Sequence, residues 1–285
     1  MKLKGMIYGA LYGIAVLCTP ACQTNELLCM TEEQYLMQEN ETQRMIESAR
    51  QGDVDAYRAL ALRYRDGIGC EQNLINAFLY QGIYCSKTGN TSIENMNIYG
   101  EGHPSAVLFE LLAGPLSNTD FVNQKLVELE KVLPLEAKTL RVVMESDSKS
   151  ILPEDMKQLE ALETDGSLLS PLVQVVFLED TGKEEDYVAL LERIAEKYPF
   201  FHSLLADYYE SKYWDTEDGS WAYKAIVCYE EADEHGLLPP RFARQYMNLC
   251  MNLQSDGLLT CSDEELARLE RIATVKKPEQ SAIDE

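Results

Sequence analysis

The sequence predicts an all-α fold built from antiparallel helix pairs. Apolar residues recur with the helical period along most of the 285-residue chain, so each helix would present one buried face. Glycine (16 residues) and proline (10 residues) are too few for a typical all-β or linker-rich protein. The candidate helices are short and joined by short connections, as in proteins built from stacked helix pairs. We therefore expect helix pairs stacked into an α-solenoid.

Residues 1–21 are expected to be a signal peptide. Lys2 and Lys4 precede an uncharged apolar run that is too short to cross a bilayer as a helix. Ala21-Cys22 resembles the cleavage site of a bacterial lipoprotein signal, although Cys18 and Thr19 depart from its usual residues. The resemblance implies lipidation of Cys22 and an exported protein anchored in the bacterial envelope, at the outer membrane. The alternative is an ordinary cysteine near a conventional cleavage site.

Residues 22–43 are polar and are expected to form a tether and a short helix. Thr31-Glu-Glu-Gln34 has the spacing of a capping box, which predicts a helix start. The α-helical repeat domain is expected over residues 44–274. Residues 275–285 are polar and are expected to form a disordered tail.

The clearest repeat covers residues 48–86. From Ala49 to Tyr64, small and large apolar residues lie along one expected helical face. Asp66-Gly-Ile-Gly69 then breaks the helix, because glycine readily adopts the left-handed backbone of a tight reversal. A second helix follows, and small residues on both helices let them approach closely.

This pattern resembles the Sel1-like repeat, a relative of the tetratricopeptide repeat, and the resemblance implies a right-handed α-solenoid. A weaker copy covers residues 199–236, where the connecting turn lacks the two glycines. Departures in the first copy are Ala61, Cys70 and Gln81. The repeat-defining matches in the two copies are Ala49, Gly52, Ala56, Leu60, Tyr64, Gly67, Gly69, Ala77, Ala225, Tyr229 and Ala232.

The middle of the chain, residues 104–197, is predicted to be helical without a readable consensus. Pro104 and Pro153 suit the first turn of a helix. Ser262-Asp-Glu-Glu265 has capping-box spacing and predicts a last helix to Ala273. The expected middle helices are Pro104–Ala113, Asp120–Val132, Leu135–Glu145, Pro153–Glu163, Ser167–Glu179 and Lys183–Lys197.

The chain is strongly acidic, with 48 acidic and 25 basic residues and a net charge of −23. Removal of the two signal-peptide lysines would give −23 − 2 = −25 for the mature chain. This charge excludes nucleic acid as a partner, because phosphates would be repelled. It favours a protein or peptide partner with a basic surface. Membrane contact is expected only through the lipid anchor.

Six cysteines would remain beside Cys22 in a compartment that permits disulfides. Cys228 and Cys250 lie on two helices of an expected hairpin around Gly236 and are the better placed pair. Their offsets from the turn are unequal, however, and buried free thiols that behave as small hydrophobic side chains are expected for most of the cysteines. No C-x-x-C spacing occurs and only 3 histidines are present, so neither a metal nor another cofactor is expected. The cysteines left open are Cys29, Cys70, Cys85, Cys228, Cys250 and Cys261.

Catalytic signatures are weak. Ser146-Asp-Ser-Lys149 and Lys87-Thr-Gly89 match two motifs of penicillin-recognising enzymes, but their order is reversed. Asp215–Gly219 departs from the calcium-loop spacing and suggests a plain acidic turn. Most carboxylate clusters, such as Glu184–Asp186, fall at expected helix starts, where the helix dipole favours negative charge.

We therefore expect a non-enzymatic scaffold that binds a protein or peptide in a helical-repeat groove. One form would be an immunity or inhibitor protein for a basic toxin. The alternative is a cell-envelope hydrolase acting on cell-wall or glycan substrates. The oligomeric state is open. The expected binding tyrosines are Tyr57, Tyr80, Tyr84, Tyr208 and Tyr213.

Overall fold

The computed structural model is helical wherever it has regular structure. It describes residues 32–90, 93–99, 104–108, 111, 119–146, 153–167, 169–181 and 183–275. Within these ranges every element is a helix and neighbouring helices pack in pairs, so the all-α prediction is confirmed. No described helix is both long and apolar enough to cross a bilayer. The expected signal peptide, Cys22 and nearly all of the expected tail lie outside the described residues.

The N-terminal repeat is divided differently from the expectation. The first described helix, α2 (Glu32–Arg50), is long and runs past residue 43, because Thr42 and Ile46 are buried against the elements that follow. The expected single helix across residues 48–66 is wrong. Gly52 has a φ of 87°, which ends α2 and turns the chain into α3 (Val54–Asp66).

The α3–α4 hairpin is fixed by its caps. The Asp53 carboxylate accepts a hydrogen bond from the Asp55 amide at 3.1 Å and starts α3. Gly67 ends α3 with a φ of 69°, as the glycine pattern predicts. The Asn73 side chain starts α4 (Leu74–Thr88), which packs along α3. The short α5 (Ile93–Met96) follows.

The expected middle helices from Asp120 onward agree with their predicted ranges to within a few residues, whereas the expected Pro104–Ala113 helix is described only in part and begins as a 3-10 helix. Pro134 and Pro153 begin α8 and α9, since proline is pre-organised for a first helical turn. Ser167 precedes α10 because its hydroxyl accepts a hydrogen bond from the Ser170 amide at 3.2 Å. The elements are the 3-10 helix η2 (Pro104–Ala106), α7 (Asp120–Glu130), α8 (Pro134–Glu145), α9 (Pro153–Thr164), α10 (Leu169–Thr181) and α11 (Glu184–Ala195).

Two further helix pairs complete the chain. The first pair is α12 (Phe201–Thr216) and α13 (Gly219–Glu234), and the second is α14 (Pro240–Ser255) and α15 (Asp263–Ala273). Ser262 caps α15 by accepting a hydrogen bond from the Glu265 amide at 3.1 Å, so the predicted helix start is confirmed. The Glu265 carboxylate does not complete a capping box, because it accepts hydrogen bonds from Arg268 instead.

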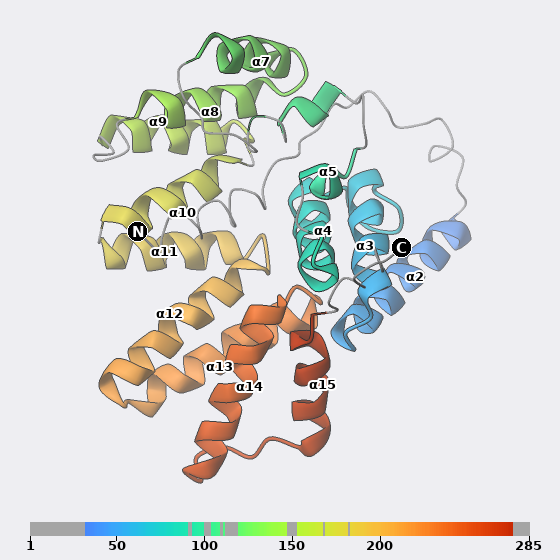
Figure 1. Cartoon of the computed structure of the whole chain (residues 1–285), viewed down its shortest axis with the longest axis vertical. Coiled ribbons are helices and arrows are strands. Elements are labelled where there is room, and N and C mark those ends of the chain that lie inside the picture. The colour runs from blue at the N-terminus through green and yellow to red at the C-terminus, as the bar shows by residue number, and fades with distance from the viewer. Residues whose placement is uncertain are drawn as a thin grey trace, which may run out of the picture.

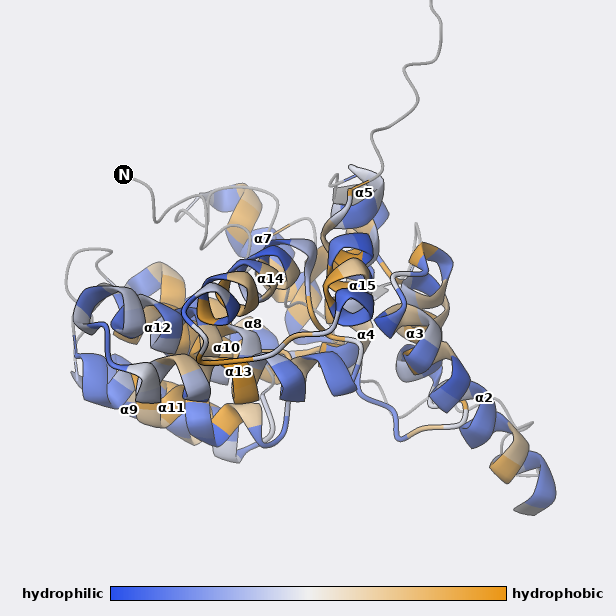
Figure 2. Cartoon of the chain, turned by 90° about the horizontal axis from the view of Figure 1, so that it is seen from below, coloured by the Kyte–Doolittle hydropathy of each residue, from blue (hydrophilic) through white to orange (hydrophobic). Residues whose placement is uncertain are grey.

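The helix pairs follow a curved path, so that the first described helices lie beside the last ones. From α7 to α15 the helices succeed one another around the molecule, and α2–α4 lie beside α14 and α15 (Figure 1). The first turns of α2 extend beyond the body of the molecule (Figure 2). Nearly all buried apolar residues form one contiguous core, and a smaller cluster joins α8, α9 and α10.

Candidate protein-binding surface

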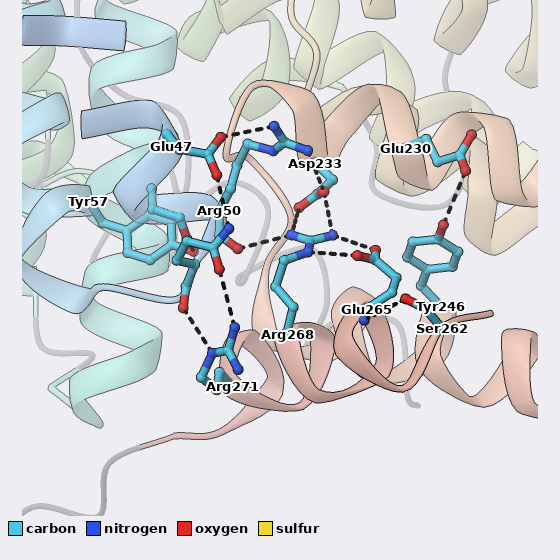
Figure 3. Close-up of polar contacts among 12 residues, drawn as sticks. Glu47, Arg50, Tyr57, Glu230, Asp233, Tyr246, Ser262, Glu265, Arg268 and Arg271 are labelled. Carbon is cyan, nitrogen blue, oxygen red and sulfur yellow. Dashed lines mark hydrogen bonds and ion pairs between the residues drawn. The ribbon is translucent and has the colours of Figure 1, made fainter. Parts of the chain in front are cut away.

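A buried ion-pair network joins helices from the two ends of the described chain (Figure 3). The Arg268 guanidinium on α15 donates hydrogen bonds to both carboxylate oxygens of Asp233 on α13, at 3.0 and 2.7 Å. It also donates to the backbone carbonyl of Arg50 at the end of α2, at 2.9 Å. Asp233 and Arg268 are only 4% and 7% exposed, so little water reaches the pair. We call this contact of α2, α13 and α15 the junction.

The electrostatics of the junction favour the charged forms. Burial lowers the pKa of Arg268, but hydrogen bonds to Glu265 and Asp233 outweigh burial and raise it above its ordinary value. The Arg268 guanidinium also holds the pKa of the Glu265 carboxyl below its ordinary value. Arg50 adds a second cation, with its Nη2 atom 3.5 Å from the Asp233 carboxylate. The network is therefore a charge-balanced structural contact.

The N-terminal hairpin also caps the last helix. The buried Lys87 ammonium on α4 donates to the carbonyl oxygens of Arg271, Ile272 and Thr274, at 3.1, 2.8 and 3.3 Å. These carbonyls lie at the end of α15, where a helix leaves its acceptors unpaired and a cation is favourable. The Tyr80 hydroxyl on α4 donates to the His235 carbonyl. Lys87 therefore has a structural role in this contact.

The repeat-defining residues lie at helix contacts. A Cβ atom added to Gly52 would lie 3.2 Å from the Arg271 carbonyl carbon, and one added to Gly236 would lie 3.2 Å from the Ala49 Cβ. Tyr64 stacks on Tyr80 with ring centroids 5.4 Å apart. Small residues therefore allow the close approaches and the tyrosines fill the space between them. The matches that are buried are Ala49, Ala56, Leu60, Gly69, Ala77, Ala225, Tyr229 and Ala232.

Three of the five expected binding tyrosines lie in the core instead. Tyr57 and Tyr80 are each 1% exposed, and Tyr213 is 8% exposed. The Tyr57 hydroxyl donates to the Ala49 carbonyl at 2.8 Å, so its polar end is used inside the protein. These side chains lie on the inward faces of their helices. Only Tyr84 and Tyr208 keep partial exposure.

The α12–α13 pair instead exposes aromatic side chains that are not among the five expected tyrosines. Trp214 near the end of α12 is 51% exposed and Tyr223 near the start of α13 is 70% exposed. On the same helix pair, the buried Tyr209 stacks on the partly exposed Trp221 with ring centroids 5.8 Å apart, and the Lys224 ammonium lies 4.5 Å from the Trp221 ring centroid. The exposed or partly exposed residues of this pair, which we group as the aromatic surface, are Tyr208, Trp214, Trp221, Tyr223 and Lys224.

The same pair carries a large excess of acid. Residues 201–234 contain nine carboxylate side chains and two lysines. Lys212 is paired with Glu184, and the turn residues Asp215, Glu217 and Asp218 are exposed. Exposed aromatic rings within an acidic surface suit a basic protein or peptide, because rings supply contact area and carboxylates supply attraction. We call the aromatic surface with its acidic turn the hairpin surface.

The catalytic candidates are held by separate structural contacts. The Ser146 hydroxyl donates to the Val142 carbonyl at 2.6 Å, and Lys87 is bound to the end of α15. Lys149 lies outside the described residues. Asp218 caps α13, and its side chain accepts a hydrogen bond from the Ser220 amide at 2.9 Å. No group of three metal-ligating side chains in the described part of the chain is arranged to hold a metal ion.

The five cysteines within the described residues are free thiols. Cys228 and Cys250, the pair that spacing favoured, are therefore not bonded to each other. Burial raises the pKa of Cys70, Cys85 and Cys228 to about 11 in each case. At neutral pH these thiols stay protonated, which is unfavourable for a nucleophile. Cys29 lies outside the described residues.

Comparison with known proteins gives no relatives to set beside this site. No family model, no curated protein and no solved structure matches the chain. The hairpin surface and the junction therefore have to be interpreted from their own residues.

Proposed function

We propose that this chain is a non-enzymatic lipoprotein of the bacterial envelope that binds a protein or peptide. In this proposal Cys22 carries the lipid anchor at the outer membrane, and the stacked helix pairs form a right-handed Sel1-like solenoid. The resemblance of the two sequence repeats supports the solenoid. The packing of neighbouring helices in pairs is compatible with it.

The hairpin surface is the observation that carries the binding role. Trp214 and Tyr223 leave half or more of their surface exposed, at 51% and 70%, although aromatic side chains gain free energy when they are buried. The surrounding carboxylates would attract a basic partner and would repel nucleic acid. An immunity or inhibitor protein that neutralises a basic toxin is one form of this function.

Affinity capture from a bacterial envelope tests the binding role. The wild-type chain is compared with the Trp214→Ala/Tyr223→Ala double variant. A matched control, Phe121→Ala/Leu258→Ala, removes side chains that are exposed to a similar degree, 61% and 66%, on α7 and after α14. We expect one basic partner with the wild type and the control, lost with the double variant and released by high salt. No specific partner at low salt, or equal capture by all three chains, would count against the proposal.

The lipid anchor is tested separately by Cys22→Ser. We expect the variant to lose the lipid mass and to leave the membrane fraction. If the variant stays membrane-bound, and if the wild type does not change in mass when the lipoprotein signal peptidase is inhibited, the anchor is not at Cys22. Because the hairpin surface is not altered, partner capture by this variant separates anchoring from binding.

A further inference from the structure

One face of α13 is exposed from its second turn to its end. Tyr223 is 70% exposed and Val227 is 36% exposed, whereas Ala222 and Ala225 on the opposite face are buried. Because they are spaced by three and four residues, the exposed side chains lie along one stripe of about 16 Å, or three helical turns. We call it the α13 stripe, and its residues are Tyr223, Val227, Glu230, Glu231 and Glu234.

The carboxylates of the α13 stripe carry negative charge that no cation of the described chain pairs. Among the described residues, Glu231 and Glu234 form no ion pair. Burial raises the pKa of Glu230, and the negative charge of Glu234 raises it further, although a tyrosine hydroxyl hydrogen-bonds to it. Lys224, the lysine of α13, instead places its ammonium 4.5 Å from the Trp221 ring centroid. The stripe therefore favours a positively charged occupant.

The shape of the α13 stripe selects a helix as its occupant. An extended peptide gains affinity by pairing its backbone with a sheet edge, and no described element is a strand. A helix instead packs rows of side chains into the grooves between the rows of another helix. Tyr223, Val227 and Glu231 form such a row, each four residues from the next. A second copy of this chain is disfavoured, because each copy carries a net charge of −23.

We propose that the α13 stripe binds a basic amphipathic helix of the partner protein. Apolar side chains of the partner helix cover Tyr223 and Val227. Lysine or arginine side chains one or two turns away on the same face of the partner helix pair with Glu231 and Glu234. The inference rests on the proposed binding function, and it names the kind of partner segment that the hairpin surface and its continuation along α13 would take.

Designed peptides test the kind of occupant. The purified full chain is titrated with labelled helical peptides of about 20 residues, a length that supports an isolated helix. Two peptides carry leucines and lysines on one helical face, in opposite orders, because helices pack in either direction. Controls scramble this face or place a proline at its centre. By fluorescence anisotropy at low salt, we expect one order to bind about tenfold more tightly than both controls. Equal binding of either control, or no binding by either order, would overturn the proposal.

Two charge variants locate the binding on α13. Glu231→Gln/Glu234→Gln should weaken peptide binding about fivefold at low salt, because two ion pairs are lost. Glu33→Gln/Glu39→Gln removes the same charge from exposed positions in the first turns of α2 and should leave the affinity unchanged. Equal weakening by both variants would mean general attraction and would overturn the stripe as the site.

Envelope capture separates this proposal from the binding function itself. We expect Glu231→Gln/Glu234→Gln to retain less of the natural partner than the wild type does. A partner that is lost with Trp214→Ala/Tyr223→Ala but captured fully by Glu231→Gln/Glu234→Gln would overturn helix binding along α13, while the binding function would stand.

Discussion

The junction and the middle helices each bury a carboxylate, but they satisfy it in different ways. At the junction, Asp233 is paired with the Arg268 guanidinium from another helix and with Arg50 from the opposite end of the described chain. In the middle, Glu136 on α8 is 2% exposed and accepts hydrogen bonds from the Ser167 hydroxyl and the Leu169 amide, both at 3.0 Å. The first arrangement needs a distant cation, whereas the second uses neutral donors at the start of α10.

This difference sets what each contact stabilises. The Glu136 network fixes one helix start, so its loss would be felt within α8–α10. The Arg268 contacts join residues separated by 35 and 218 positions, so they hold three helices together. A buried charge is also costly when its partner is removed, because the remaining ion has neither water nor a counter-charge. The junction is therefore where we expect single substitutions to have the largest effect.

Arg268→Met should produce that largest effect. It leaves Asp233 buried with only the more distant Arg50, and we expect a loss of about 3–5 kcal/mol in the free energy of unfolding. Arg193→Met is the matched control, because Arg193 pairs with Glu163 but its side chain is 52% exposed. We expect about 0–1 kcal/mol for this exposed pair. Urea unfolding followed by circular dichroism measures both.

A second substitution checks the reason for the loss. Asp233→Asn in the Arg268→Met background removes the stranded charge and should recover part of the stability. Equal losses for Arg268→Met and Arg193→Met, or no recovery in the double variant, would mean that the junction does not depend on the buried charge pair.

Gly69→Ala should produce the next largest effect. Gly69 has a φ of 64°, and an added Cβ would collide with the Gln38 carbonyl group of α2. Gly257→Ala is matched in backbone strain, with a φ of 71°, but its added Cβ would meet no atom within 4 Å. We expect about 1–2 kcal/mol for Gly257→Ala from the left-handed backbone alone, and about 1–3 kcal/mol more for Gly69→Ala from overpacking. Thermal unfolding of the two variants gives the difference, and equal losses would contradict a tight contact between α2 and the turn that joins α3 to α4.

The helices could be predicted because their signals are local. The apolar period locates α8, and together with the first-turn residue Pro153 it locates α9, to within a residue or two. The turn at Gly52 was missed because the apolar face continues on both sides of it. The junction could not be predicted, because no sequence pattern connects Arg268 with the Arg50 carbonyl across 218 positions.

The candidate surface was predicted less well than the fold, although a signal for it was present. The repeat pattern indicates Tyr57 and Tyr80 as aromatic residues but does not by itself say which helix face they occupy. On α13, Ala222, Ala225 and Tyr229 form the buried face, so the helical period alone places Tyr223 on the opposite face. On α12, Tyr213 is buried, and the next residue along the helix, Trp214, faces outward.

The pH dependence of stability offers a smaller but more selective test of the two acidic regions. At the junction, the hydrogen bond from Arg268 lowers the pKa of Glu265 below its ordinary value of 4.5. Glu265 therefore adds stability above about pH 4.5, and the contribution is lost as the pH falls through the lowered pKa. In the α12–α13 pair, burial raises the pKa of Glu210. Ionised Glu210 therefore costs stability at neutral pH, and the cost disappears as the pH falls below the ordinary pKa.

The glutamine variants should consequently show opposite slopes. The stability of the wild type relative to Glu265→Gln should decrease from about pH 7 to about pH 4, whereas its stability relative to Glu210→Gln should increase. Urea unfolding across this range measures both differences in one buffer series. Glu210→Gln keeps an oxygen that can accept the hydrogen bond that the Tyr229 hydroxyl donates at 2.7 Å. Slopes of the same sign would show that Glu210 is stabilised by its hydrogen bonds more than it is penalised by burial. The α12–α13 pair would then resemble the junction in favouring the charged form of its buried acid.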